Sequence, residues 1–260
     1  LALGVAATGE ALAQTAASDP QQFTKIERGR YLSVVGDCAS CHTVSGAEPY
    51  AGGLELNTPF GTLLSANITS DQQTGIGAMT LEEFRATMRD GRGRHDKRLY
   101  PAMPYPSYTL TTDDDIAALY AYFQTIPAVS HDVQTNQLSF PFSLRADMAV
   151  WNLMEFDKGP YQPDASQTEE WNRGAYLVNG LGHCNTCHTT KNLLFGDKSG
   201  REYEGGLIDG WFAPNITGSK QYGLGDWSVD EVVSYLKTGA NDRALASAGM
   251  AEVIVNSTSQ

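Results

Sequence analysis

The chain has 260 residues, of which 41% are apolar, so it is too hydrophobic to remain disordered and long enough for one to three domains. Its 18 Lys and Arg residues against 30 Asp and Glu residues give a net charge of −12, which argues against nucleic-acid binding because phosphates would be repelled. There is no apolar run of about 18 residues, so the sequence predicts no membrane-spanning helix.

The first 13 residues have the features of the end of a secretory signal peptide. The chain starts with Leu1 rather than Met, the stretch 1–7 is mostly apolar, and Ala11-Leu12-Ala13 fits a small-residue cleavage site. We therefore expect residues 1–13 to be a signal peptide remnant and the mature protein to be exported to the periplasm. A flexible Ala-rich terminus is the alternative.

A first helical unit is expected over residues 20–127. A short helix precedes the motif Cys38-Ala39-Ser40-Cys41-His42. A second helix begins after Thr80, which forms a capping box with Glu83. A third helix follows Thr112, with three aspartates at its positive end. The loops between these helices are rich in Gly and Pro and show no sustained strand alternation, so the sequence predicts an all-α fold.

Residues 128–168 join this unit to a second one. They contain Phe140-Pro141-Phe142 and a group of further apolar residues that could pack between the units or bind a partner: Met148, Trp151, Leu153, Met154 and Phe156. The acidic, Pro-containing end of this segment predicts an exposed linker.

Residues 169–260 repeat the first unit at an offset of 145 to 153 residues. The repeated words are Arg28-Gly29-Arg30-Tyr31-Leu32 with Arg173-Gly174-Ala175-Tyr176-Leu177, Cys38-x-x-Cys41-His42 with Cys184-x-x-Cys187-His188, and Asn67-Ile68-Thr69 with Asn215-Ile216-Thr217. Ser228 and Glu231 repeat the capping box, and Val232, Val233 and Leu236 are expected to face inward. The third helix has no counterpart here, so we expect this second copy to be incomplete at its C-terminus.

The motif Cys-x-x-Cys-His is the attachment signature of c-type haem. Two thiols add across the two vinyl groups of haem, and the adjacent imidazole reaches the iron. The motifs therefore predict two covalent haems, held by Cys38, Cys41 and His42 and by Cys184, Cys187 and His188. A four-cysteine zinc site, a thioredoxin-like redox site and disulfides are the alternatives. The zinc site would need two pairs that lie 146 residues apart to be close in space, the thioredoxin-like site would need a βαβ context, and disulfides leave the His after each pair unexplained.

Met103 and Met250 are the candidate sixth ligands of the two irons. Met103 lies 61 residues after His42, and Met250 lies 62 residues after His188. Thioether ligation opposite a His is common in electron carriers and raises the reduction potential. Core packing is the alternative for both residues.

The other histidines and the repeated asparagines are not assigned a definite role. We assign no role to His95, His131 or His183. The side chains of Asn67 and Asn215 could bind a haem propionate, or each could form an Asx turn within its own loop.

The sequence resembles the cytochrome c subunits of membrane-bound bacterial alcohol, gluconate and sugar dehydrogenases. The resemblance covers roughly residues 22–260 and rests on the repeated words above together with Pro49-Tyr50-Ala51-Gly52-Gly53, Gly75-Ile76-Gly77 and Tyr100-Pro101-Ala102-Met103-Pro104-Tyr105. It implies iron ligation by Met103 and Met250. It also implies a flavin- or quinone-dependent dehydrogenase as partner, with ubiquinone or a downstream oxidase as acceptor. Such subunits usually carry three haem domains and a C-terminal membrane-associating segment, whereas this chain has two haem motifs. A third haem domain and the membrane contact are therefore expected beyond the C-terminus or on the partner.

We accordingly predict two tandem class I-like cytochrome c domains with long loops, at 20–127 and 169–260, joined by the linker 128–168. The predicted function is electron transfer from a dehydrogenase towards the quinone pool, in the periplasm and peripheral to the cytoplasmic membrane. The alternative is a catalytic dihaem enzyme of the thiosulfate dehydrogenase or peroxidase type, which would need one haem with an open or unusual axial position.

Overall fold

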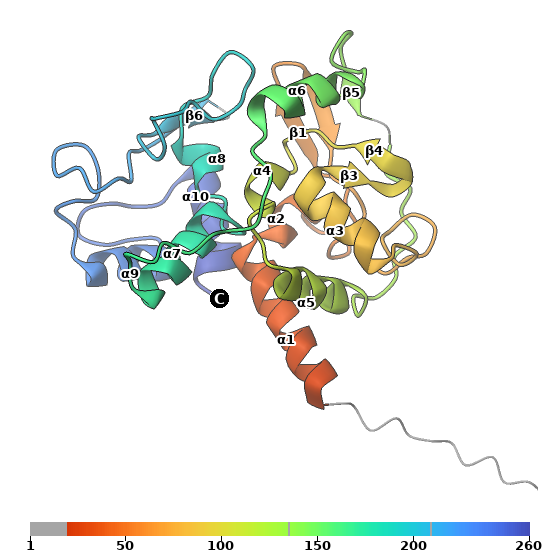
Figure 1. The fold of residues 1–260 in the computed structure, drawn as a ribbon, viewed down its shortest axis with the longest axis horizontal. Helices are drawn as coiled ribbons and strands as arrows, with labels where there is room; N and C mark the ends of the chain where they lie inside the picture. Colours follow the sequence, from red (N-terminus) through yellow and green to blue (C-terminus); the bar gives the residue numbers. More distant parts are fainter. Residues whose placement is uncertain (1–19, 135, 209) are drawn as a thin grey trace, which may run out of the picture.

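The computed structural model describes residues 20–134, 136–208 and 210–260 (Figure 1). The predicted signal peptide remnant, residues 1–13, lies outside these ranges. None of the helices within them is both long and apolar enough to cross a bilayer.

The first copy is built from helices with small strands between them. Its elements are α1 (Pro20–Val35), α2 (Cys38–His42), β1 (Glu55–Thr58), β2 (Gly61–Leu64), α3 (Leu81–Asp90), β3 (Arg92–Gly93), a 3-10 turn (Arg94–Asp96), β4 (Lys97–Arg98), α4 (Tyr105–Tyr108) and α5 (Asp113–Phe123). α1 packs against α5, and α3 packs against α4 and α5.

The segment between the copies carries structure of its own. β5 (Gln137–Leu138) pairs antiparallel with β2, and α6 (Asp147–Glu155) follows it. The predicted linker is therefore partly folded onto the first copy. Figure 1 shows α6 (green) lying across the top of the molecule, next to β5 and β1.

The second copy has the same order of elements at its start. They are α7 (Glu169–Asn179), α8 (Asn185–His188), β6 (Gly206–Ile208), β7 (Trp211–Ala213) and α9 (Val229–Thr238). The chain then forms α10 (Ala248–Val253) and a π-helical turn η2 (Ile254–Thr258), which contacts both α9 and α1. In Figure 1 this copy (green to blue) lies beside the first, with α10 near the boundary between them.

Helices are the main regular elements of the described residues, but the all-α prediction is not confirmed because the chain also forms short sheets. One sheet has the order β1-β2-β5, and β3-β4 and β6-β7 are two-stranded hairpins. Each strand has two to four residues. Strands this short are held by backbone hydrogen bonds within loops, and they leave too few residues for an alternating pattern to be visible.

The predicted helix starts are confirmed. Thr80 Oγ1 accepts the Glu83 N–H, and the Glu83 carboxylate accepts the Thr80 N–H, which completes the capping box of α3. Ser228 and Glu231 form the same pair of bonds at α9. Thr112 caps α5 by accepting from the Asp115 N–H.

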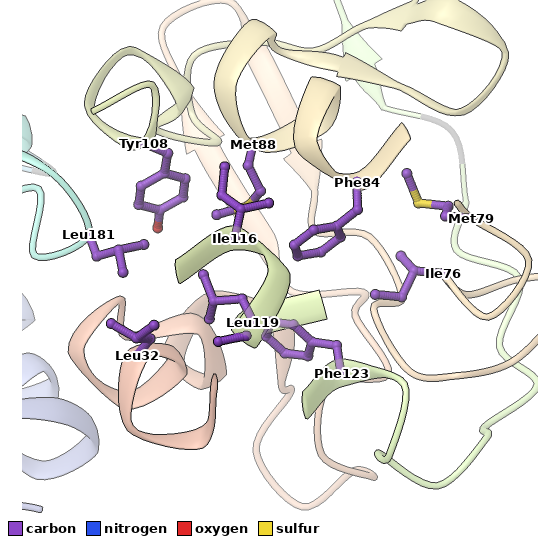
Figure 2. Close-up of a cluster of buried hydrophobic side chains, with 11 residues drawn as sticks. Leu32, Ile76, Met79, Phe84, Met88, Tyr108, Ile116, Leu119, Phe123 and Leu181 are labelled. Carbon is purple, nitrogen blue, oxygen red and sulfur yellow. The ribbon is translucent and has the colours of Figure 1, made fainter. Parts of the chain in front are cut away.

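The buried apolar cluster lies in the first copy. Its members are Leu32, Ile76, Met79, Phe84, Met88, Tyr108, Ile116, Ala118, Leu119, Phe123 and Leu181 (Figure 2). Leu181 is the exception, because it comes from the segment after α7 in the second copy and is 1% exposed. Burial of one leucine side chain contributes about 1.5–3 kcal/mol, so this residue helps to hold the copies together.

The second copy buries much less of its own apolar surface. Among its described residues, the buried apolar side chains are Tyr176, Leu181 and Ile254. Val233 is 54% exposed and Leu236 is 37% exposed, so the prediction that both face inward is wrong. Within the described residues, α9 contacts the short turn η2, whereas α3 packs against the longer helix α5.

Candidate functional site: two haem attachment motifs

The first Cys-x-x-Cys-His motif lies on a single short helix. α1 ends before Gly36, and Asp37 takes the left-handed conformation (φ 49°) that turns the chain into α2. Cys38 and Cys41 are one helical turn apart, so their thiols lie on the same side of α2. Burial raises the pKa of Cys38 to about 12 and that of Cys41 to about 11, so both thiols are protonated at neutral pH.

The imidazole that follows the thiols is oriented by a backbone carbonyl. His42 Nδ1 lies 2.7 Å from the carbonyl oxygen of Ala66. A carbonyl can only accept, so Nδ1 carries the proton and Nε2 keeps its lone pair. Burial also lowers the pKa of His42, which favours the neutral ring. This is the state in which an imidazole ligates a metal.

The second motif reproduces this geometry. His188 Nδ1 lies 2.7 Å from the carbonyl oxygen of Pro214. The backbone around the rings repeats as well, because Gly52 N–H donates to the His42 carbonyl and Gly205 N–H donates to the His188 carbonyl, each at 2.8 Å. The two copies therefore build the same surroundings for their imidazoles.

The repeated asparagines form turns within their loops. Asn67 Oδ1 accepts the N–H and hydroxyl of Thr69, and Asn215 Oδ1 accepts the same groups of Thr217. The Asx-turn interpretation is confirmed for both. Asn67 Nδ2 also donates to the Val129 carbonyl, so both polar ends of this side chain bond to other groups of the protein.

The two predicted methionine ligands lie in different surroundings. Met103 is half-buried in a bend before α4, and its carbonyl accepts the Tyr105 N–H at 2.7 Å. Met103 and Cys38 pack against the same buried cluster, so the structure brings them to one region. Met250 lies half-buried on α10, where Glu252 is close enough to Cys41 to raise its pKa.

The attachment motifs of the two copies adjoin each other. Ser40, inside the first motif, accepts a hydrogen bond from Asn256 Nδ2 of η2 at 2.8 Å. Asn185, inside the second motif, accepts one from Ser107 Oγ of α4 at 3.1 Å. Cys187 contributes to the raised pKa of Cys41, which also requires the motifs to be near each other. The sequence analysis did not predict this contact, because the two motifs lie far apart in the chain.

Two of the other histidines, His131 and His183, have structural contacts. His131 Nδ1 lies 2.8 Å from the Ala51 carbonyl, so it anchors the start of the linker. His183 stacks edge-on against Tyr108 of the first copy, with ring centroids 5.7 Å apart. Burial lowers the pKa of His183 and keeps the ring neutral in this contact.

The alternatives to haem find no support in this geometry. Cys38, Cys41 and Cys184 are not joined in disulfides. Within the part of the chain that the structure describes, no three His, Cys, Asp or Glu side chains converge to hold a metal ion, which weighs against a four-cysteine zinc site.

The donor set fits haem c in both copies. Each motif offers two cysteine thiols at or beside a short helix and one imidazole whose Nδ1 lies against a backbone carbonyl, which leaves Nε2 for the iron. The weakly buried second copy also fits a large apolar group, because Leu207, Trp211 and Phe212 of its hairpin are all exposed. The geometry is that of a protein with c-type haem attachment sites.

Comparison with known proteins supports the assignment of haem c attachment sites. The cytochrome c family model matches residues 26–127. A dihaem c-type cytochrome of Cereibacter sphaeroides is 35% identical over 279 aligned positions, covering 100% of this chain and 90% of that protein. The chain belongs to the cytochrome c family.

Other relatives are larger proteins. One of the subunits of nicotinate dehydrogenase from Pseudomonas putida is 47% identical over 86% of this chain but only 19% of that protein. The gluconate 2-dehydrogenase cytochrome c subunit of Pantoea cypripedii is 40% identical over 93% of this chain and 57% of that protein. The chain thus spans about half the length, or less, of these relatives.

Proposed function

We propose that this chain is an electron-transfer cytochrome with two haem c groups, one in each copy. Cys38 and Cys41 hold the first haem and Cys184 and Cys187 hold the second. Residues 20–127 and 169–260 form the two domains, and residues 128–168 connect them. The observation that carries the proposal is the matched hydrogen bond from His42 to Ala66 and from His188 to Pro214, each at 2.7 Å.

Haem supplies a one-electron redox couple when it is bound. The residues of this chain orient it and set its potential. His42 and His188 would each provide an imidazole nitrogen to the iron, with their rings oriented by the carbonyl bonds, and Met103 and Met250 would each provide a thioether sulfur. A thioether ligand raises the potential and closes the iron to substrates, which suits a carrier better than an oxidising enzyme.

The partner we propose is a flavin- or quinone-dependent dehydrogenase. Three relatives are named as cytochrome subunits of gluconate, fructose and alcohol dehydrogenases, with 40%, 42% and 40% identity. Electrons would leave this chain towards ubiquinone or a downstream oxidase. We also propose a periplasmic location peripheral to the cytoplasmic membrane, and the predicted signal peptide remnant in residues 1–13 supports the export.

The test is haem content and ligation in protein purified from a host that matures c-type cytochromes. We expect two haems per chain, both low-spin, with the weak near-infrared band of methionine ligation. Met103→Ala should lower the potential of one haem and Met250→Ala that of the other, because each loses its thioether ligand. Met154→Ala, an exposed methionine on α6, is the matched control and should change neither.

Three results would contradict parts of this proposal. A colourless product would overturn it entirely. An unchanged redox titration of Met103→Ala would remove the ligand assignment of that residue. A high-spin component in the wild-type spectrum would favour a catalytic dihaem enzyme.

A further inference from the structure

The outer face of α6 is apolar although it is exposed to solvent. Val150, Leu153 and Met154 lie at positions i, i+3 and i+4 of this helix and are 60%, 88% and 61% exposed. The inner face carries Trp151 and Asn152, which contact the rest of the protein. An exposed apolar stripe on a helix whose other side is half-buried against the protein is unusual for a free surface.

Segments that contact α6 or precede it carry further exposed apolar side chains. Phe140 is 80% exposed in the turn before α6, and Leu193 is 98% exposed in a loop of the second copy. The two segments meet because Phe142 and Phe195 both pack on the ring of Phe60, at centroid distances of 4.3 and 4.8 Å. We call Phe140, Phe142, Val150, Leu153, Met154 and Leu193 the α6 surface.

Hydrogen bonds fix the α6 surface to both copies. The Trp151 indole N–H donates to the Leu194 carbonyl at 2.8 Å, which ties α6 to the second copy. Tyr100 donates to the Phe142 carbonyl at 2.8 Å, which ties the preceding turn to the first copy. A preorganised apolar surface loses little side-chain and loop entropy when a partner binds.

The same segment covers the loop that carries Met103. Tyr105 donates its hydroxyl to Asn152 of α6 at 2.6 Å, and its ring lies edge-on to Trp151 at 6.4 Å. Tyr105 N–H in turn donates to the Met103 carbonyl at 2.7 Å. A partner bound to the α6 surface would therefore sit directly over the proposed ligand loop of the first haem.

The charges around the α6 surface distinguish the possible occupants. Lys158 pairs with Asp90 at 2.8 Å, and Arg145 donates to the Arg98 carbonyl and lies over the Tyr100 ring. The charge of Lys158 is thus balanced by Asp90, whereas Arg145 keeps its charge because its partners are neutral. The helix α6 itself carries Asp147 and Glu155 and no basic residue, so this edge is acidic. An anionic membrane would be repelled by this edge. A second copy of this chain would place like charges together and carries a net charge of −12 itself.

We propose that the α6 surface is the docking site for the catalytic dehydrogenase subunit, which presents an apolar patch edged by basic side chains. This inference rests on the proposed function, because it takes a dehydrogenase as the partner. It adds which face of the chain the partner occupies and which copy lies nearest to it.

The experiment places a photo-crosslinking amino acid at Leu153 in the haem-loaded chain, expressed in its native host. Position Val229, which is 78% exposed on α9, is the matched control site. We expect crosslinking at position 153, and not at 229, to a polypeptide identified by mass spectrometry as a flavin- or quinone-dependent dehydrogenase. In parallel, Leu153→Glu should slow substrate-driven haem reduction about tenfold, which corresponds to a loss of about 1.4 kcal/mol at a central interface residue. Val229→Glu should not slow it, and both variants should keep wild-type potentials and chemical reduction by dithionite.

The outcomes separate the two proposals. Crosslinking of position 153 to lipid or to a second copy, or wild-type reduction of Leu153→Glu without a dehydrogenase crosslink, would overturn the docking site and leave the carrier function standing. A wild-type chain that no dehydrogenase substrate reduces would overturn both.

Discussion

The hydroxyl of Tyr176 in α7 donates a hydrogen bond to Asp115 Oδ2 in α5 at 2.7 Å and joins the two copies. Asp115 is 1% exposed, and its other oxygen accepts from Arg28 of α1 at 2.5 Å. The Thr112 N–H, at the start of α5, donates back to the Tyr176 oxygen at 3.1 Å. The buried carboxylate is thus satisfied by one group from each of the helices around it and by the positive end of α5.

Tyr176→Phe should lower the free energy of unfolding by about 1–3 kcal/mol, because it leaves part of a buried carboxylate without a donor. The repeat supplies a matched control. Tyr31 occupies the equivalent position in the first copy but is 47% exposed, so Tyr31→Phe should change stability by less than about 0.5 kcal/mol. Urea unfolding of both haem-loaded variants measures the difference. Equal losses would show that the Tyr176 bond does not stabilise the contact between the copies.

Gly29 and Gly174 also occupy equivalent positions, and only the first is packed. A Cβ at Gly29 would lie 2.0 Å from the Ala118 carbonyl oxygen of α5, whereas one at Gly174 would meet nothing within 4 Å. Gly29→Ala should therefore push α1 away from α5 and cost about 1–3 kcal/mol. Gly174→Ala should be neutral or stabilise by up to about 1 kcal/mol, since Ala favours helix. Thermal unfolding of the two variants side by side is the measurement, and a destabilised Gly174→Ala would reveal a neighbour of α7 in solution.

Asp37 should make stability fall as pH rises in the acid range. Burial raises the pKa of its carboxyl to about 6, and Glu252 adds to the effect, although the Ser40 hydroxyl opposes it by donating at 2.6 Å. Between about pH 4 and about pH 6 the folded state then binds more protons than the unfolded state, so the free energy of unfolding decreases with pH, on the order of 2 kcal/mol in total.

Asp37→Asn should remove this decrease and raise stability at neutral pH by a similar amount. Asn can keep the left-handed backbone at this position (φ 49°), so the turn into α2 is preserved. The check is urea unfolding of wild type and variant at about pH 4 and about pH 7. Parallel pH profiles for the two proteins would contradict the prediction.

Removal of one haem should affect the second copy more than the first. Apart from Tyr176 and Leu181, which face the first copy, the buried apolar side chain described in the second copy is Ile254. Replacing Cys184 and Cys187 by Ala should therefore expose the amides of α9 to fast hydrogen exchange. The corresponding change at Cys38 and Cys41 should leave α5 better protected, because α1 and α3 pack against it. Equal exchange in both double variants would show that the second copy does not depend on its haem.

The sequence alone determined the features that depend on residues close together in the chain. The Cys-x-x-Cys-His motifs and the capping boxes of Thr80 and Ser228 could be identified because their partners lie within four residues, where local geometry leaves few alternatives. The duplication could be identified because the same motifs recur in the same order. The tertiary structure decided the rest. The burial of Leu181 in the core of the first copy, the bond from Tyr176 to Asp115 across 61 residues, and the exposed face of α6 all depend on where distant segments meet. Equivalent residues of the repeat, such as Tyr31 and Tyr176, have the same local sequence pattern but different neighbours, so only packing could separate their roles.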